Sequence, residues 1–146
     1  IKIIFDDEHF LPSLDKNKAI SYYDKGPVVG MLLDLAIRNA SNNQFSLDHV
    51  MRLMYQEYYQ RLQRGFTDAE FQAACEQMAG QSLANEFEFI STTKQLDYQK
   101  YLGYAGLTLT STEIEKGGQK KLQYKISPLP SFTADQLAML NSWLGD

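Results

Sequence analysis

The pattern of apolar positions predicts a buried helix early in the chain. Over residues 27–39 nearly every side of such a helix is apolar, which is typical of a helix surrounded by other elements. Pro27 suits the first helical position, where its missing N–H costs nothing. Ser21, with Asp24 three residues later, offers an alternative start that leaves Pro27 inside the helix. We therefore favour a start near Pro27 and keep the earlier one as the alternative.

Capping patterns predict two amphipathic helices downstream. Ser46 is expected to begin a helix that runs to about Arg61. Thr67 and Glu70 form a capping box for the next helix, and Gly80 is expected to end it. The 3.6-residue spacing assigns to the buried faces Leu47, Val50, Met51, Met54 and Tyr58, then Phe71, Ala74, Cys75 and Met78. Shorter helices are expected over residues 82–90 and 96–102.

Near the end of the chain, apolar and polar positions alternate with the two-residue period of a β-strand. Residues 107–114 and 122–126 flank Gly117 and Gly118, which predicts a β-hairpin that the segment 127–130 ends. Thr133 has the capping pattern for a terminal helix through Leu144, closed by Gly145. A short strand is expected within residues 1–5. The expected fold class is therefore mainly α, with a C-terminal β-hairpin and a terminal helix.

Composition narrows the classes of protein. The chain has 146 residues, which suits one domain, and 44% of them are hydrophobic. It carries 14 basic and 18 acidic residues, a net charge of −4, which does not favour nucleic acid as a partner. One cysteine excludes an intrachain disulfide framework. The longest apolar run is shorter than the roughly 20 residues of a membrane span. Because the chain opens with Ile1 and shows no leader, we interpret it as a piece of a longer protein.

Few residues carry chemistry that the sequence can identify. His9 follows the acidic residues 6–8 and could touch a metal, but a solvated acidic loop is the favoured interpretation. His49 is expected in a first helical turn, with a surface or capping role. Cys75 is expected in the core rather than as a nucleophile, and the glycine-containing segment 103–106 as a turn rather than a dinucleotide site. Neither metal-ligand nor paired-carboxylate spacing is found.

A series of short blocks runs along the middle of the chain: Ser21–Gly26 with Leu33–Arg38, Ser46–Arg52, Gly65–Phe71, Ala79–Leu83 and Tyr101–Leu107. Together these blocks resemble one family of enzymes, the glycyl aminopeptidases, which are zinc metallopeptidases. They keep the family's order and spacing over about Ser21–Leu109, and this collinear series carries the resemblance.

The resemblance implies a specific fold and activity. Such enzymes have an N-terminal β domain, a thermolysin-like catalytic domain and usually a C-terminal PDZ domain. They remove small N-terminal residues, glycine above all, from peptides. The resemblance assigns residues 21–106 to the helical C-terminal part of the catalytic domain, after an irregular segment 1–20 and before the hairpin and helix of 107–146. The zinc ligands and the general base would lie upstream of Ile1, so this chain is expected to hold no zinc and to be inactive alone.

One catalytic group is expected within the chain. Related enzymes carry a Tyr-Glu-Lys-Gly stretch whose tyrosine stabilises the oxyanion, and the resemblance aligns Tyr23 with it, with Tyr22 as the alternative. A small residue usually follows this Lys-Gly pair, whereas here it is Pro27. The tail after Leu109 is too short for a PDZ domain.

The resemblance also predicts partners. The N-terminal half of the same protein and a peptide substrate are expected, and a fragment would expose an apolar patch near Val28, Met31 and Leu35 that could drive self-association. The alternatives are a non-enzymatic helical interaction or scaffold module derived from the family, and a helical domain with a superficial likeness.

Overall fold

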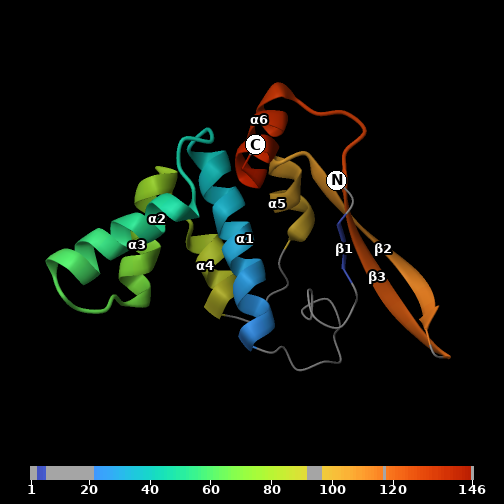
Figure 1. Ribbon diagram of the computed structural model, residues 1–146, viewed down its shortest axis with the longest axis horizontal. Helices are drawn as coiled ribbons and strands as arrows, with labels where there is room; N and C mark the ends of the chain where they lie inside the picture. Colours follow the sequence, from blue (N-terminus) through green and yellow to red (C-terminus); the bar gives the residue numbers. More distant parts are fainter. Residues whose placement is uncertain (1–2, 6–21, 92–96, 117, 146) are drawn as a thin grey trace. The chain divides into compact units, whose positions relative to one another are not determined.

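The computed structural model describes residues 3–5, 22–91, 97–116 and 118–145. Its elements are β1 (Ile3–Phe5), α1 (Tyr22–Ala40), α2 (Leu47–Met54), the π-helix η2 (Tyr55–Arg61), α3 (Asp68–Ala79), α4 (Ala84–Ser91), α5 (Tyr98–Tyr104), β2 (Leu107–Lys116), β3 (Gln119–Pro128) and α6 (Ala134–Leu144) (Figure 1). The chain divides into two compact units, one of Ile1–Leu32 with Gln95–Asp146 and one of Leu33–Lys94. The predicted fold class, mainly helical with a hairpin and a terminal helix, is confirmed.

Helix α1 begins earlier than the favoured prediction. It starts at Tyr22, directly after Ser21, so the alternative start is correct and Pro27 lies inside the helix. A proline cannot donate to the carbonyl four residues back, here that of Tyr23. The missing bond falls about a turn and a half from the helix start. The 19-residue helix is otherwise uninterrupted.

The exposed patch expected along α1 is wrong. Val28 is only 3% exposed and Leu35 is fully buried, because the chain's own residues cover them. Met31 is half-buried. The one polar edge of the helix carries Asp34 and Arg38, whose carboxylate Oδ2 and guanidinium Nε lie 3.0 Å apart. Asp34 Oδ1 also accepts a hydrogen bond from the backbone N–H of Leu47, which ties α1 to the start of α2.

The unit Leu33–Lys94 is built from consecutive helices. α2 and η2 follow each other without a break, and α3 packs against α2 (Figure 1). Thr67 Oγ1 accepts from the N–H of Glu70, and Gly80 closes α3 with φ of +70°, as the capping patterns predict. The core of this unit contains Leu33, Leu35, Ala36, Ile37, Val50, Met54, Ala74, Cys75, Ala79 and Leu83.

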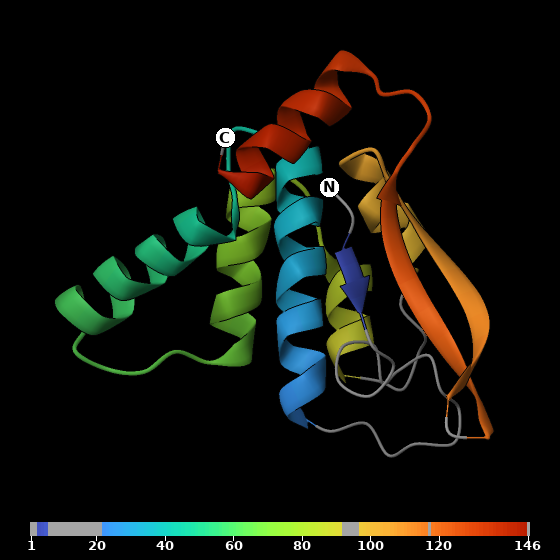
Figure 2. The ribbon, with the colours of Figure 1, turned by 45° about the vertical axis from the view of Figure 1, so that its right-hand side comes forward.

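The other unit contains the sheet, whose strand order is β1-β3-β2 with both pairs antiparallel. β2 and β3 form a long hairpin that pairs from Leu107 with Pro128 to Lys116 with Gln119 (Figure 2). The turn therefore falls between Lys116 and Gln119, as expected, and Gly118 has φ of +76°. Both strands are longer than predicted. β3 continues through Pro128 because a proline at a strand end removes no ladder bond from the strand's interior.

Helices α5 and α6 join the hairpin in this unit. α5 contacts β2, and Gln99 Oε1 accepts from the N–H of Leu109 at 3.0 Å. Gln136 of α6 donates through Nε2 to the carbonyl of Gly103 at the end of α5. The core here contains Val28, Leu32, Tyr98, Tyr101, Leu102, Ala105, Leu107, Tyr124, Ile126 and Met139. Among all described helices, none combines the length and the apolar character that crossing a membrane requires.

Candidate functional site

The predicted oxyanion donor lies at the start of α1. Tyr22 and Tyr23 are the first two residues of this helix, and their side chains lie outside the described part of the structure. The geometry therefore fixes the backbone that carries the two phenols and leaves the role of Tyr23, and of Tyr22 as its alternative, a prediction. His9 and the acidic residues 6–8 also lie outside the described residues.

His49 has the structural role that the sequence allowed. Its Nδ1 accepts from the backbone N–H of Ser46 at 3.2 Å and lies 2.9 Å from Ser46 Oγ. The pair closes a capping box at the start of α2, with histidine in the place that glutamate usually takes. The Phe45 ring and the imidazole are nearly perpendicular, with their centroids 5.6 Å apart. The imidazole is thus held by local contacts of the cap.

Cys75 is a core residue, as expected. It is fully buried on α3, and this burial raises the pKa of its thiol to about 12. The thiol is therefore protonated at neutral pH and is a poor nucleophile or metal ligand. Throughout the described ranges, no three His, Cys, Asp or Glu side chains come together in a way that would hold a metal ion. These residues therefore do not fit the zinc that the resemblance implies.

The segment 103–106 is a turn only in part: Gly103 and Tyr104 are the last residues of α5, and Ala105 and Gly106 form the predicted turn. The N–H of Gly106 donates to the carbonyl of Gly103 at 3.0 Å, and Gly106 has φ of +67°. A side chain at Gly106 would meet the ring of Phe132, so the glycine is needed both for its backbone conformation and for the close approach of that ring. Ala105 and Gly106 link α5 to β2.

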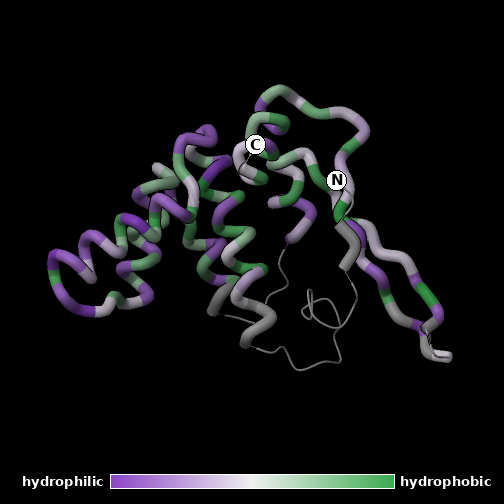
Figure 3. The backbone as a smooth tube through the Cα atoms, viewed as in Figure 1, coloured by the Kyte–Doolittle hydropathy of each residue, from purple (hydrophilic) through white to green (hydrophobic). Residues whose placement is uncertain are grey.

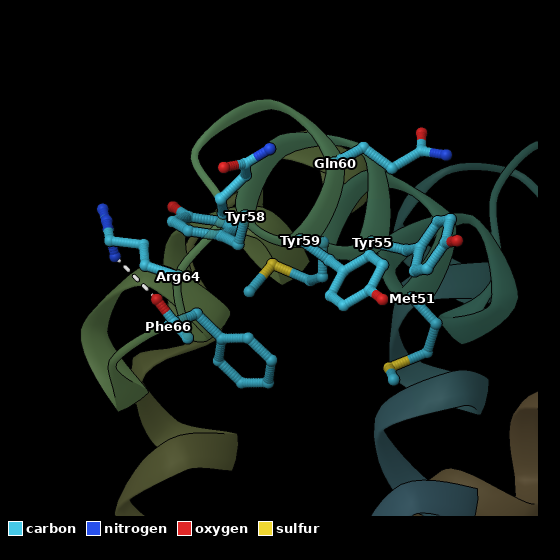
Figure 4. Close-up of a pocket in the computed structure, with 10 residues that line it drawn as sticks. Met51, Tyr55, Tyr58, Tyr59, Gln60, Arg64 and Phe66 are labelled. Atoms are coloured by element: carbon cyan, nitrogen blue, oxygen red, sulfur yellow. Dashed lines mark hydrogen bonds between the residues drawn. The ribbon is translucent and has the colours of Figure 1, made fainter.

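A groove on the surface of the unit Leu33–Lys94 is a site that the sequence did not reveal. It has a volume of about 800 Å³ and is open to solvent. η2 and the loop after it form most of its walls (Figure 4). The lining residues are Met51, Met54, Tyr55, Tyr58, Tyr59, Gln60, Gln63, Arg64, Gly65 and Phe66.

The groove is rich in exposed aromatic rings. Tyr55 and Tyr59 stack with their centroids 5.1 Å apart and their planes at 19°, and Met51 lies beside them (Figure 4). Tyr59 is 67% exposed and Tyr55 53%. Tyr58 meets Phe66 edge to face at 6.1 Å. Ligand-binding clefts are commonly lined by such rings with a few polar groups among them.

The π-helix accounts for part of this exposure. Within η2 the N–H of Leu62 reaches back five residues to the carbonyl of Glu57, at 2.9 Å, rather than four. The wider turn changes the phase of the side chains from Tyr55 onward, and no residue of η2 is buried. The predicted burial of Met51 is wrong, since it is 50% exposed. The buried face is centred on Val50 and Met54, which leaves Met51 on its flank.

Charge at the groove is largely compensated. The guanidinium of Arg64 lies 5.0 Å from the centre of the Tyr58 ring, and its Nη2 lies 2.8 Å from Oε1 of Glu70. The hydrogen bonds from Arg64 and from the N–H of Thr67 lower the pKa of Glu70 to about 2. Arg61 is paired with Glu57 within η2. The groove itself is therefore apolar, with amides and a neutralised guanidinium at its rim.

Sequence reasoning missed the groove for an identifiable reason. Met51, Tyr55 and Tyr59 stand at four-residue spacing, a pattern that also suits a buried helix face. Figure 3 shows hydrophilic and hydrophobic residues intermixed along α2 and η2, which is typical of a helical segment that packs on one side only. The periodicity assigned Met51 and Tyr58 to the buried face and did not include Tyr55 or Tyr59.

Comparison with known proteins adds no relative. No protein-family model matches the chain, and no match was found among curated proteins or among solved structures.

Proposed function

We propose that this chain is the helical C-terminal part of the catalytic domain of a zinc-dependent aminopeptidase that removes small N-terminal residues, glycine preferred, from peptides. The observation that carries the proposal is the collinear series of family-like blocks from Ser21 to Leu109. The resemblance behind this proposal assigns the zinc ligands and the general base to polypeptide upstream of Ile1. That N-terminal half and the peptide substrate are the proposed partners.

The local structure is consistent with these blocks as structural units. Ser46 opens one block and Thr67 lies within another. These two residues are the N-caps of α2 and α3. Gly80 and Gly106, which lie in two others, take the left-handed conformation that glycine favours. The blocks therefore coincide with the starts and ends of elements, where a fold depends most on particular residues.

Tyr23 is the proposed oxyanion donor, with Tyr22 as the alternative. Attack of water on a peptide carbonyl places negative charge on its oxygen, and a phenol O–H can donate a hydrogen bond to that oxygen. A zinc ion bound upstream would activate the water. Tyr22 and Tyr23 are the first two residues of the helix α1.

The experiment uses the longer polypeptide with its zinc. We expect Tyr23→Phe to retain zinc and KM for a glycine-based aminopeptidase reporter while kcat falls about 10²- to 10³-fold. Tyr22→Phe is the matched control and should change kcat by no more than a few-fold. If only Tyr22→Phe lowers kcat, the role belongs to Tyr22. A longer polypeptide that binds no zinc and hydrolyses no reporter would overturn the peptidase proposal.

A second candidate is a non-enzymatic helical interaction or scaffold module. The exposed aromatic groove on α2 and η2 favours it, because exposed apolar surface of this kind marks contact sites. Two results together would support this candidate. The longer polypeptide would bind no zinc and show no activity, and Tyr55→Ser, which opens the groove, would abolish partner binding. An active enzyme in which that variant leaves kcat and KM unchanged would show that the groove has no part in hydrolysis.

A further inference from the structure

One exposed stripe follows α2 and η2 along a single side. It consists of Asp48, Met51, Arg52, Tyr55 and Tyr59, at spacings of three and four residues, and we call it the α2–η2 stripe. Met51 is 50% exposed, and both tyrosines are more exposed still. Single exposed apolar residues need no explanation, whereas a contiguous row of them indicates a contact surface.

The stripe is held rigidly. On the opposite side of α2, Val50 is fully buried and Met54 is 2% exposed, so the helix is anchored in the core of its unit. The stacked rings of Tyr55 and Tyr59 fix each other. A surface that is already ordered loses little conformational entropy when it is covered.

The charges on the stripe complement each other. Asp48 and Arg52 stand one helical turn apart, both exposed, and line one hollow of about 460 Å³ together with Met51 and Tyr55. Within the described part of the chain, the side chains of Asp48 and Arg52 form no hydrogen bond or ion pair. One acidic and one basic side chain thus lie on either side of Met51.

A row of this kind is complementary to itself. In a two-fold interface each residue pairs with a different residue of the other copy, and the second pair repeats the first in reverse. When two such helices pack antiparallel with the axis close to Met51, Asp48 of each copy faces Arg52 of the other. The two Met51 side chains then lie next to the axis, and Tyr55 of each copy lies beyond the charge pairs, toward the two ends of the interface. An anionic membrane would require an excess of basic residues on the rod, which the balanced charges of the stripe do not supply.

We propose that the α2–η2 stripe is a homodimer interface, on which a second copy of this chain docks antiparallel about a two-fold axis. One helix on each side buries less than the roughly 1,200–2,000 Å² of stable complexes, so the dimer is weak and forms with rising concentration. The proposal does not depend on the peptidase function.

Sedimentation equilibrium over a concentration series measures the dimer directly. We expect the unmodified chain to dimerise, and Asp48→Arg and Arg52→Asp each to weaken dimerisation at least tenfold, because like charges then face each other twice. A one-to-one mixture of the two variants should associate again, because one copy supplies two basic and the other two acidic side chains at the same positions. Tyr55→Ser should weaken dimerisation in every background.

Asp68→Arg is the matched control. Asp68 lies in the first turn of α3, as Asp48 does in α2, so both substitutions lose the same favourable interaction with a helix N-terminus. Asp68 lies outside the stripe, and its variant should dimerise like the unmodified chain. Circular dichroism checks that every variant is folded. An unmodified chain that stays monomeric, single variants that dimerise normally, or a mixture that fails to associate would each overturn the proposal.

Discussion

Helices α2 and α3 begin alike and end differently. Both open with a capping box, of Ser46 with His49 in α2 and of Thr67 with Glu70 in α3. α3 ends cleanly at Gly80, and its buried residues reach its last position, Ala79. α2 has no such end, and its rod continues for seven residues as η2, none of them buried.

The difference shows what sets the two ends of a helix. A capping box acts through hydrogen bonds within four residues, so it works wherever the pattern occurs. Many helices end at a residue in the left-handed conformation, which glycine adopts cheaply at position 80. After α2 the next glycine is Gly65, and the helical segment continues through η2 to Arg61. The exposed rings of η2 lie in this continuation.

The largest effect is expected from a comparison of a buried residue of α2 with an exposed residue of η2. Met54→Ala removes a side chain that is 2% exposed, and we expect it to lower the free energy of unfolding by about 2–5 kcal/mol. Tyr59→Ala, at 67% exposure, should change it by no more than about 0.5 kcal/mol. Urea denaturation followed by circular dichroism measures both. Equal losses would show that η2 is packed as firmly as α2.

The second prediction concerns the C-terminal ends of α3 and of η2. Gly80→Ala forces an alanine to φ of +70° in open space, so backbone strain alone should lower the free energy of unfolding by about 1 kcal/mol. Gln63, after η2, already has φ of +51°. Gln63→Gly relieves that strain and should leave stability unchanged or raise it by up to about 0.5 kcal/mol. Opposite signs, measured by the same urea titration, support the comparison. A loss of stability in Gln63→Gly would contradict it.

The third prediction tests the capping boxes that begin α2 and α3. Thr67→Ala and Ser46→Ala each remove a side-chain oxygen from a capping box, and each should cost about 1 kcal/mol. Amide hydrogen exchange in the first turn of the affected helix should accelerate, while the other helix keeps its protection. A loss confined to one helix would show that only one of the two caps is needed.

Much of the fold could be predicted because it depends on such local signals. Thr67, Gly80, Thr133 and Gly145 mark the starts and ends of α3 and α6 as the sequence indicates. The earlier start of α1 was the less favoured of two possibilities, because a proline inside a helix carries a penalty that depends on position. The local pattern does not say how a long helix tolerates Pro27.

The candidate groove could not be predicted for a different physical reason. Met51, Tyr55 and Tyr59 have the spacing of a core face, and only the tertiary packing of Val50 and Met54 shows which side is covered. The change from four-residue to five-residue hydrogen bonding in η2 has no recognised composition, so its effect on side-chain phase is visible only in the structure. The patch predicted at Val28 and Leu35 failed in the same way, since burial is a property of neighbours.

The smallest effect expected is the pH dependence of the capping box of α3. The hydrogen bonds from Arg64 and from the N–H of Thr67 lower the pKa of Glu70 to about 2, below its ordinary value in the unfolded chain. The folded state therefore binds fewer protons here, so the stabilisation is complete above about pH 5 and is lost as the pH falls toward 2. Because the carboxylate is exposed to solvent, the effect is modest.

Glu70→Gln isolates this contribution. We expect the urea midpoint of the unmodified chain to exceed that of the variant at pH 7 and the gap to close as the pH falls from 5 to 2. Arg64→Gln removes the first cause of the shift, so in that background the gap should be smaller and should close at higher pH. At the start of α2, His49 takes the place of this glutamate, and a Glu70→Gln change should leave hydrogen exchange there unaltered. A gap that stays constant with pH would show that the carboxylate acts through its shape rather than its charge.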